Sequence, residues 1–253
     1  MKVFLIIPAA GLGTRMNAPS ASGKAAGAAG QAAKQFTELD GAPILVHTLR
    51  RFAHLTAVAG IFIAMRSAEA EWFEARLRKE KFASLIRIVE GGDHRQQSVS
   101  NALQQIKAAD DDIVLVHDAV RPFVDRETID HVISVADRCG AAIAGIPAVD
   151  TVKQVERTAE GAVIASTIPR ERVVLAQTPQ GFRFRLLQRA FEQAAAEGFI
   201  GTDEASLVEH IGEAVAVVMG SARNIKITTP ADLELAEFYF SVDARRANFS
   251  NGD

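Results

Sequence analysis

The sequence predicts an α/β protein, a Rossmann-like three-layer α/β/α domain with a mostly parallel sheet and a projecting β-arm. Two observations carry this prediction. Short apolar runs, typical of strands buried on both faces of a sheet, alternate with longer segments of helical period. The region at about 148–172 interrupts this alternation with strand-like runs that lack a long apolar face. Alternating strands and helices fold into layers joined by right-handed crossovers.

The strands are predicted from short runs rich in β-branched and aliphatic residues. The first, Val3–Ile7, is bounded by Pro8 and Gly11, residues that commonly end a strand. The remaining runs, in chain order, are Ile61–Met65, Ile86–Val89, Ile113–Val116, Ala141–Ile146, Val173–Ala176 and Val215–Val218.

Helices are predicted between these runs. Their approximate ranges are 43–54, 69–82, 95–107, 126–138, 184–196, 203–212 and 230–241. In the third, Val99, Ala102, Leu103 and Ile106 form a core-facing stripe at helical spacing. In the last, Thr229 is a suitable N-cap and Pro230 suits the first helical position.

Two segments depart from this rhythm. Residues 18–33 contain eight Ala and three Gly and no apolar stripe, which favours a mobile loop at about 17–33. In the second segment, Thr151–Val155 and Val163–Thr167 flank a Glu160-Gly161 turn signal. Pattern alone leaves two readings open for this hairpin: an arm that pairs with another subunit, or an edge hairpin on the same domain.

Composition limits the class of protein. The 253 residues carry 28 Lys and Arg against 31 Asp and Glu, and this net charge of −3 argues against a general nucleic-acid binder. No run of apolar residues is long enough to span a membrane or to form a signal-peptide core, so we expect a single cytoplasmic domain over 1–253. Cys139 is the only cysteine and is expected to be a small core residue.

The loop after the first strand is the first candidate for chemistry. The small residues Ala9, Ala10, Gly11 and Gly13 allow backbone N–H groups to approach a phosphate, and Arg15 adds a fixed positive charge. The dinucleotide fingerprint fails because Met16 replaces its third glycine, and the P-loop fails because Ala25 follows Gly23-Lys24. A tight turn with a solvated arginine remains the alternative.

Three further motifs follow the predicted mobile loop at 17–33 or a predicted strand. Lys34-Gln35 comes directly after the mobile loop. Gly91-Gly92-Asp93 with Ser98 opens a helix, and Asp118-Ala119 with Arg121 ends a buried strand. Ligands bind beyond the carboxyl ends of strands in open α/β sheets. Asp118 there is a natural partner for magnesium or a ribose, and Arg121 for an anion.

Later polar clusters are individually weak signals. They are Asp150-Thr151, Arg170, Thr178-Pro179-Gln180, Gly201-Thr202-Asp203-Glu204 and Asn224-Ile225-Lys226, and each alone is typical of a cap, a turn or a surface. The six histidines form no zinc-binding spacing, and no Gly-x-Ser-x-Gly elbow occurs. Zinc hydrolysis and serine hydrolysis are therefore unsupported.

Taken together, these motifs resemble the 2-C-methyl-D-erythritol 4-phosphate cytidylyltransferase family. They occur in the family's order and cover nearly the whole chain. The carrying residues are Pro8–Met16, Lys34-Gln35, Gly91–Arg95 with Ser98-Val99, Val116–Pro122, Asp150-Thr151, Thr178–Gln180, Thr202–Ser206 and Asn224–Lys226. The Lys-Gln-Phe context favours Lys34 over Lys24 as the lysine of the site.

The resemblance implies an enzyme that transfers a cytidylyl group from CTP to 2-C-methyl-D-erythritol 4-phosphate and releases pyrophosphate. It also implies Mg²⁺, held mainly by the nucleotide phosphates with Asp118 nearby, and a homodimer clasped through the 148–172 arm. The implied catalytic residues are Arg15, Lys34, Arg170 and Lys226. The implied nucleotide-binding residues are Ala9, Ala10, Gly11, Gly13, Gly92, Asp93, Ser98, Asp118 and Ala119. The implied acceptor-binding residues are Arg121, Thr151, Arg170, Thr202 and Lys226, with Arg170 reaching the partner subunit's site.

Three other functions are compatible with parts of the pattern. A cytidylyltransferase acting on ribitol phosphate or a related polyol phosphate would share the nucleotide loops and differ in the acceptor pocket. A non-catalytic nucleotide sensor could dispense with Arg15, Lys34 or Lys226, and all three are present. A Rossmann dehydrogenase is disfavoured by the missing third glycine.

Overall fold

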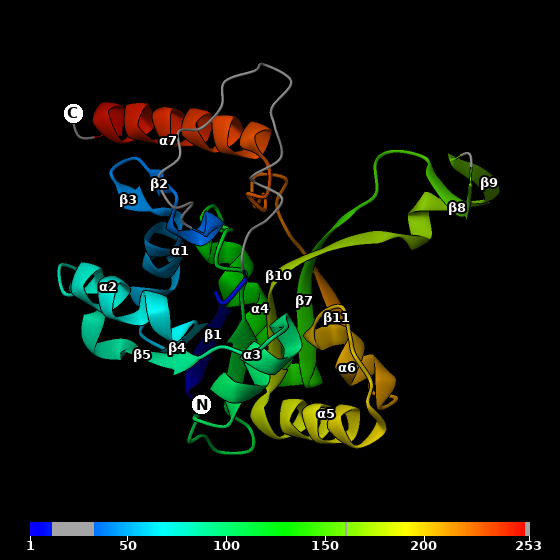
Figure 1. The fold of residues 1–253 in the computed structure, drawn as a ribbon, viewed down its shortest axis with the longest axis horizontal. Coiled ribbons are helices and arrows are strands. Elements are labelled where there is room, and N and C mark those ends of the chain that lie inside the picture. The colour runs from blue at the N-terminus through cyan, green and yellow to red at the C-terminus, as the bar shows by residue number, and fades with distance from the viewer. Residues whose placement is uncertain (12–32, 160, 251–253) are drawn as a thin grey trace.

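A mostly parallel, seven-stranded sheet forms the centre of the computed structural model, which describes residues 1–11, 33–159 and 161–250 (Figure 1). The strand order is β11-β7-β10-β6-β1-β4-β5. All neighbouring pairs are parallel except those of β10, which runs antiparallel to both β6 and β7. The strands are β1 (Val3–Pro8), β4 (Val58–Met65), β5 (Ile86–Glu90), β6 (Ile113–Val116), β7 (Ala141–Pro147), β10 (Val174–Arg183) and β11 (Ala216–Met219).

Helices cover both faces of this sheet, which confirms the predicted three-layer architecture. They are α1 (Ile44–Ala53), α2 (Ser67–Leu77), α3 (Arg95–Leu103), α4 (Arg126–Cys139), α5 (Phe184–Glu197), α6 (Glu204–His210) and α7 (Pro230–Ser250). The last helix continues beyond the expected end at 241 because no Gly or Pro interrupts it before Ser250, and Arg223 pairs with Asp243 on its extension.

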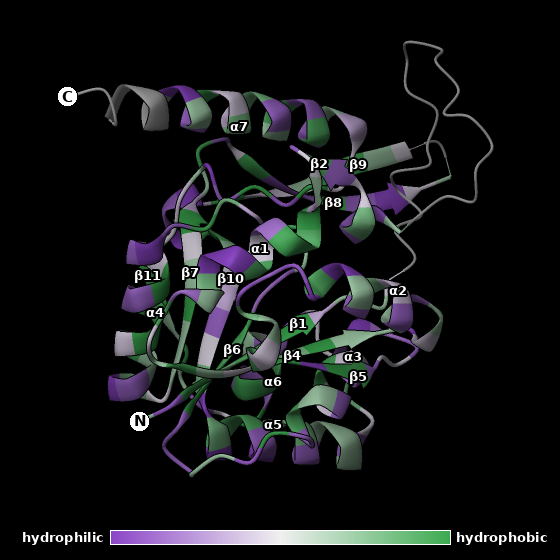
Figure 2. Ribbon diagram, turned by 90° about the vertical axis from the view of Figure 1, so that its left-hand side faces the viewer, coloured by the Kyte–Doolittle hydropathy of each residue, from purple (hydrophilic) through white to green (hydrophobic). Residues whose placement is uncertain are grey.

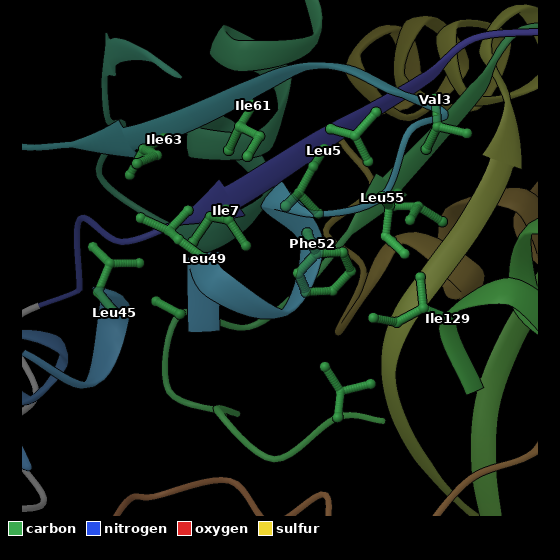
Figure 3. Packing of buried hydrophobic residues seen from close by; sticks show 14 of the residues in the cluster. Val3, Leu5, Ile7, Leu45, Leu49, Phe52, Leu55, Ile61, Ile63 and Ile129 are labelled. Atoms are coloured by element: carbon green, nitrogen blue, oxygen red, sulfur yellow. The ribbon is translucent and has the colours of Figure 1, made fainter. Parts of the chain in front are cut away.

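The alternation of side chains along β1 divides the core into two layers. Val3, Leu5 and Ile7 belong to one buried cluster, whereas Phe4 and Ile6 belong to another on the opposite face. Figure 3 shows the first cluster, where side chains of β1 lie against Leu45, Leu49 and Phe52 of α1. Figure 2 shows hydrophobic colouring along β1, β4 and β6 and more polar colouring on α4. A strand buried on both faces explains the continuous apolar run in the sequence.

Cys139 differs from expectation, because it is exposed rather than part of the core. It is the last residue of α4, and Gly140 directly after it adopts φ +92°. The buried stripe of this helix ends at Ala136, so the final turn faces away from the sheet.

Two small hairpins extend from the main sheet. β2 (Glu38–Leu39) and β3 (Ala42–Pro43) follow a short 3₁₀ turn, η2 (Lys34–Phe36), which buries Phe36. β8 (Val152–Thr158) and β9 (Gly161–Ile168) form an antiparallel hairpin that stands away from the body of the protein in Figure 1. The side chains of this hairpin are almost all exposed. The hairpin lies within the residues predicted to form a β-arm, and its role as an arm that pairs with another subunit stays a prediction.

The mobile-loop prediction for 17–33 falls almost entirely outside the described residues, as do Gly13 and Arg15. Within the described part of the chain, no helix combines the length and apolar character needed to cross a bilayer.

Candidate active site

Two adjoining cavities open beyond the carboxyl ends of β1 and β6, where the order of the strands reverses direction. The larger, of about 260 Å³, is lined by Pro8, Ala9, Ala10, Gly11, Lys34, Gln35, Gly92, Asp93, His94, Arg95, Ser98, Asp118, Ala119, Val120 and Lys226. The smaller, of about 210 Å³, is lined by Arg95, Asp118, Arg121, Ala176, Gln177, Thr178, Gln180, Thr202, Asp203 and Lys226. Three charged residues, Arg95, Asp118 and Lys226, therefore border both cavities.

The structure thus brings together most of the residues that the sequence singled out. Among the described residues to which the resemblance gives a site role, Thr151 and Arg170 are the exceptions, because they flank the root of the β8–β9 hairpin and line neither cavity. Arg170 is exposed, and its Nη1 donates a hydrogen bond to the carbonyl of Val149 at 2.8 Å.

The loop after β1 forms one wall of the larger cavity. The backbone N–H of Ala9 still bonds β4 at the carbonyl of Ala64, so the loop leaves the sheet only after this residue. The buried side chain of Gln35 then donates Nε2 to the carbonyl of Ala9 at 2.5 Å and to that of Gly11 at 3.3 Å. These bonds fix the carbonyl side of the loop. In the sequence, only its position next to Lys34 indicated that Gln35 belongs to the site.

The Gly91–Ser98 segment forms the opposite wall. A Cβ atom at Gly91 would overlap the Cβ of Ala10, so the two walls pack together only because this residue is glycine. The Ser98 hydroxyl accepts a bond from Gly92 N at 3.0 Å and donates to the His94 carbonyl at 3.1 Å. Ser98 therefore shapes the loop. The N-cap of α3 is His94, whose side chain accepts from Gln97 N.

Asp118 is the electrostatic centre of the site and is 7% exposed. Its Oδ2 lies 2.9 Å from Lys226 Nζ and 3.1 Å from Arg121 Nε, and its Oδ1 lies 3.7 Å from Arg95 Nε. Burial opposes the charged form of this carboxyl, but the three cations hold its pKa well below the usual range. Three cations therefore surround this one carboxylate at the border of the two cavities.

A buried hydrogen-bond network around His117 and Thr178, called the relay below, fixes the backbone next to Asp118. His117 Nε2 donates to the Arg121 carbonyl at 3.0 Å, and Nδ1 accepts from the Thr178 hydroxyl at 3.0 Å. The same hydroxyl accepts from the N–H of Asp118 at 3.0 Å. Burial lowers the pKa of His117 to about 4, so the imidazole is neutral at pH 7, as these bonds require.

Asn224 joins the last segment to this relay. Its Nδ2 donates to the carbonyl of Thr178 at 2.8 Å, while its own carbonyl accepts from Arg121 Nη1 at 2.6 Å. These two bonds place Lys226 next to Asp118. The sequence placed Thr178 and Asn224 in motifs without giving them roles, because a buried supporting contact resembles a turn or cap residue in sequence.

The chemistry of the site is that of anion binding. Small-residue loops on one side and clustered cations on the other can hold two phosphorylated ligands with their phosphates near the shared boundary. Among the described residues, no group of three or more His, Cys, Asp or Glu side chains could hold a metal ion.

Comparisons with known proteins agree with this geometry. A sequence profile of the family described as IspD, 2-C-methyl-D-erythritol 4-phosphate cytidylyltransferase, matches residues 3–242. A protein of that name from Acidobacterium capsulatum is 56% identical over 239 residues, covering 94% of this chain and 97% of its own length. One from Solibacter usitatus is 49% identical over 250 residues, covering 99% of this chain and all of its own length.

Solved structures give the same result. The Francisella tularensis 2-C-methyl-D-erythritol 4-phosphate cytidylyltransferase superposes with a TM-score of 0.76 at 34% identity, covering 94% of this chain and 99% of its own. The enzyme from Thermus thermophilus superposes at 0.72 and 33% identity, covering 94% and 98%. The chain therefore belongs to the 2-C-methyl-D-erythritol 4-phosphate cytidylyltransferase (IspD) family, a family of nucleotidyltransferases.

Proposed function

We propose that this protein transfers a cytidylyl group from CTP to 2-C-methyl-D-erythritol 4-phosphate in the non-mevalonate route to isoprenoid precursors. The products are 4-diphosphocytidyl-2-C-methyl-D-erythritol and pyrophosphate. The observation that carries the proposal is the pair of adjoining cavities, whose common border is formed by Arg95, Asp118 and Lys226.

The larger cavity takes the nucleotide in this proposal. Ala9, Ala10 and Gly11 line this cavity, and the N–H groups of Ala10 and Gly11 approach the phosphates because their own side chains are small; the N–H of Ala9 is already bonded to the carbonyl of Ala64. Gly13 and Arg15 lie outside the described residues and keep the roles that the resemblance implies. Gly92, Asp93 and Ser98 line the opposite wall and form the cytidine side, with Ala119 on the floor.

The smaller cavity takes the acceptor. Its cations, Arg121 and Lys226, suit a phosphate monoester, and Thr202 at its rim offers a hydroxyl to a polyol. Arg121 is held in place by Asp118 and by the Asn224 carbonyl, so its orientation is set before a ligand arrives.

The proposed reaction needs positioning and positive charge rather than a protein nucleophile. An oxygen of the acceptor phosphate attacks the α-phosphorus of CTP, and the bond from that phosphorus to the β-phosphate oxygen breaks. The second pKa of a phosphate monoester is about 6, so the attacking oxygen is already ionised at neutral pH. Lys34, Lys226 and Arg15 would stabilise the negative charge that accumulates in the transition state.

Magnesium fits this site through the nucleotide. Asp118 is a carboxylate at the boundary of both cavities, but its oxygens already face three cations. Mg²⁺ prefers carboxylate and phosphate oxygens and keeps several waters. In the proposal the phosphates of CTP therefore supply most of its ligands, with Asp118 nearby, and the bound ion offsets phosphate charge.

The arm supports a proposed homodimer. Val155, Val163 and Ile164 are exposed apolar residues on the hairpin, and such residues favour burial against another surface. A second copy that clasps the arm would bring Thr151 and Arg170 towards the partner subunit's acceptor cavity. Because the reaction consumes CTP, the cytoplasm is the proposed location.

Pyrophosphate release tests the proposed function. The protein is incubated with Mg²⁺, CTP and either 2-C-methyl-D-erythritol 4-phosphate or ribitol 5-phosphate, and UTP and ATP replace CTP as controls. Rapid release only with CTP and methylerythritol phosphate is the expected result. Faster release with ribitol phosphate would transfer the function to the related polyol class, and CTP binding without release from any pair would indicate a sensor.

A matched pair of variants links the activity to the site. Lys226→Gln removes one of the two cations shared by both cavities, whereas Lys107→Gln makes the same change at an exposed position that lines neither cavity. The first should abolish most of the release, and the second should retain it.

A further inference from the structure

A buried carboxylate stands behind the two cavities. Glu204, at the start of α6, is 1% exposed and lines neither cavity. Arg95 Nη1 lies 2.8 Å from its Oε1 and 2.9 Å from its Oε2. Arg95 is the first residue of α3, on the nucleotide side of the site, so this ion pair joins two segments that are 109 residues apart in the chain.

Arg95 faces two carboxylates at once. Glu204 holds the guanidinium from behind through Nη1, while Nε faces Asp118 Oδ1 inside the site at 3.7 Å. Burial opposes the charge of Arg95, but these carboxylates raise its pKa. If Glu204 carried no charge, Asp118 would be the remaining ion-pair partner of the guanidinium, and Asp118 already binds Lys226 and Arg121. Glu204 thus keeps Arg95 on the border between the cavities.

The neighbouring residue makes a second connection to the same segment. Gln96 Nε2 donates to the Phe199 carbonyl at 3.1 Å, and its Oε1 accepts from Gly201 N at 2.9 Å. Together with the Arg95–Glu204 pair, these bonds attach the first turn of α3 to both sides of Thr202. The nucleotide wall and the rim of the acceptor cavity are therefore mechanically joined.

The segment around Thr202 is also held by β10, on the side away from α3. Gln180 on β10 donates Nε2 to Asp203 Oδ2 at 2.7 Å and accepts from Ala205 N at 3.1 Å. Asp203 and Ser206 complete a capping box at the start of α6. A displacement of α3 must then move the Thr202 segment as a unit or break several hydrogen bonds between partly or fully buried groups.

Stability alone is a weak explanation for this ion pair. Taking a carboxylate and a guanidinium out of water costs free energy that their attraction often fails to repay, and well-packed apolar residues can replace such pairs without loss. Burial raises the pKa of Glu204, which Arg95 partly offsets. The position of Arg95 in the lining of both cavities points to a role in ligand binding instead.

We propose that Glu204 is a positioning residue which, through Arg95, couples occupation of the nucleotide cavity to binding in the acceptor cavity. The inference rests on the function proposed above. Ordering of the Gly91–Ser98 wall by the nucleotide would place Arg95 and the Thr202 segment for the acceptor, and the acceptor would in turn strengthen nucleotide binding by the same factor.

Calorimetry with a non-reacting nucleotide tests this coupling. The Kd of 2-C-methyl-D-erythritol 4-phosphate is measured without nucleotide and with saturating α,β-methylene-CTP and Mg²⁺. In the wild-type protein the nucleotide should tighten acceptor binding, within the range of about 5–150-fold found for coupled sites. In Glu204→Gln, which keeps the shape and removes the charge, this factor should fall close to 1.

Control variants separate coupling from a general structural effect. Glu209→Gln makes the same change on an exposed residue of α6 and should keep the wild-type factor. Gln96→Ala cuts the second connection and leaves the ion pair, so it should lower the factor partially. It also tests the connection independently if Glu204→Gln fails to fold. A coupling factor in Glu204→Gln or Gln96→Ala equal to that of the wild type would overturn the inference.

A failure of the proposed function would give a different result from a failure of the inference about Glu204. Wild-type protein that neither releases pyrophosphate nor binds methylerythritol phosphate would refute the function. Wild-type protein that turns over normally but shows a coupling factor of 1 would refute only the inference about Glu204.

Discussion

The buried histidine of the relay makes the stability of this protein dependent on pH. His117 is fully buried between Phe52, Thr178 and the Arg121 carbonyl, and burial lowers its pKa from 6.5 to about 4. Between these two values the unfolded chain binds a proton that the folded protein does not bind. Stability should therefore rise with pH through this window, and it is lost as pH falls from about 6.5 towards 4.

The size of this effect follows from the two pKa values. The linkage relation gives a loss of about 2 kcal/mol in unfolding free energy from His117 alone between pH 7.5 and pH 5. Burial also lowers the pKa of His47, which adds an effect of the same sign. A comparison of variants is therefore needed to isolate His117.

Urea unfolding at pH 7.5 and pH 5 measures the difference. His117→Gln keeps a donor for the Arg121 carbonyl and has no titrating group at this position. Between pH 7.5 and pH 5 the unfolding free energy of this variant should therefore fall by about 2 kcal/mol less than that of the wild-type protein. His54→Gln alters an exposed histidine and should retain the wild-type dependence. Equal pH dependence in wild-type protein and His117→Gln would refute the reasoning.

Three further predictions concern the site and the core. Lys34→Ala should lower the single-turnover rate by roughly 100-fold, the typical loss for one preorganised donor, while Lys107→Ala leaves it unchanged; equal rates would remove Lys34 from the proposed mechanism. Gly91→Ala forces a methyl group against Ala10, so titration should detect weaker CTP binding and urea unfolding a loss of about 1–3 kcal/mol. Phe182→Ala empties a fully buried position away from both cavities and should cost about 3–5 kcal/mol in urea unfolding with little change in KM.

Much of the fold could be predicted from the sequence, because buried parallel strands leave unbroken apolar runs such as Val3–Ile7. β10 was predicted only in part. Its second half, Thr178–Arg183, contains polar residues and a proline that resemble a loop, yet it pairs antiparallel with β6 and β7. The polar groups of Thr178 and Gln180 form hydrogen bonds with Asp118 and Asp203 of the site instead of with solvent. No local sequence pattern reveals these partners.

The site was predictable to a similar degree. The carboxyl ends of parallel strands meet at one edge of the sheet, so motifs after β1, β5 and β6 had to converge. The supporting contacts were not predictable in the same way. Arg95 and Glu204 each stand at a helix start, where a charged residue has an ordinary local explanation, and only the folded chain brings them together.

The way the arm is attached to the sheet has a practical consequence for protein engineering. β10 begins at the root of the arm, where Val174 pairs with Pro147, and the same strand carries Thr178 into the site. One residue inserted at this root would shift the register and turn Thr178 away from Asp118. The turn between Thr158 and Gly161 lies at the opposite end of the hairpin, so a label or peptide tag can be placed there without altering the strand that carries Thr178.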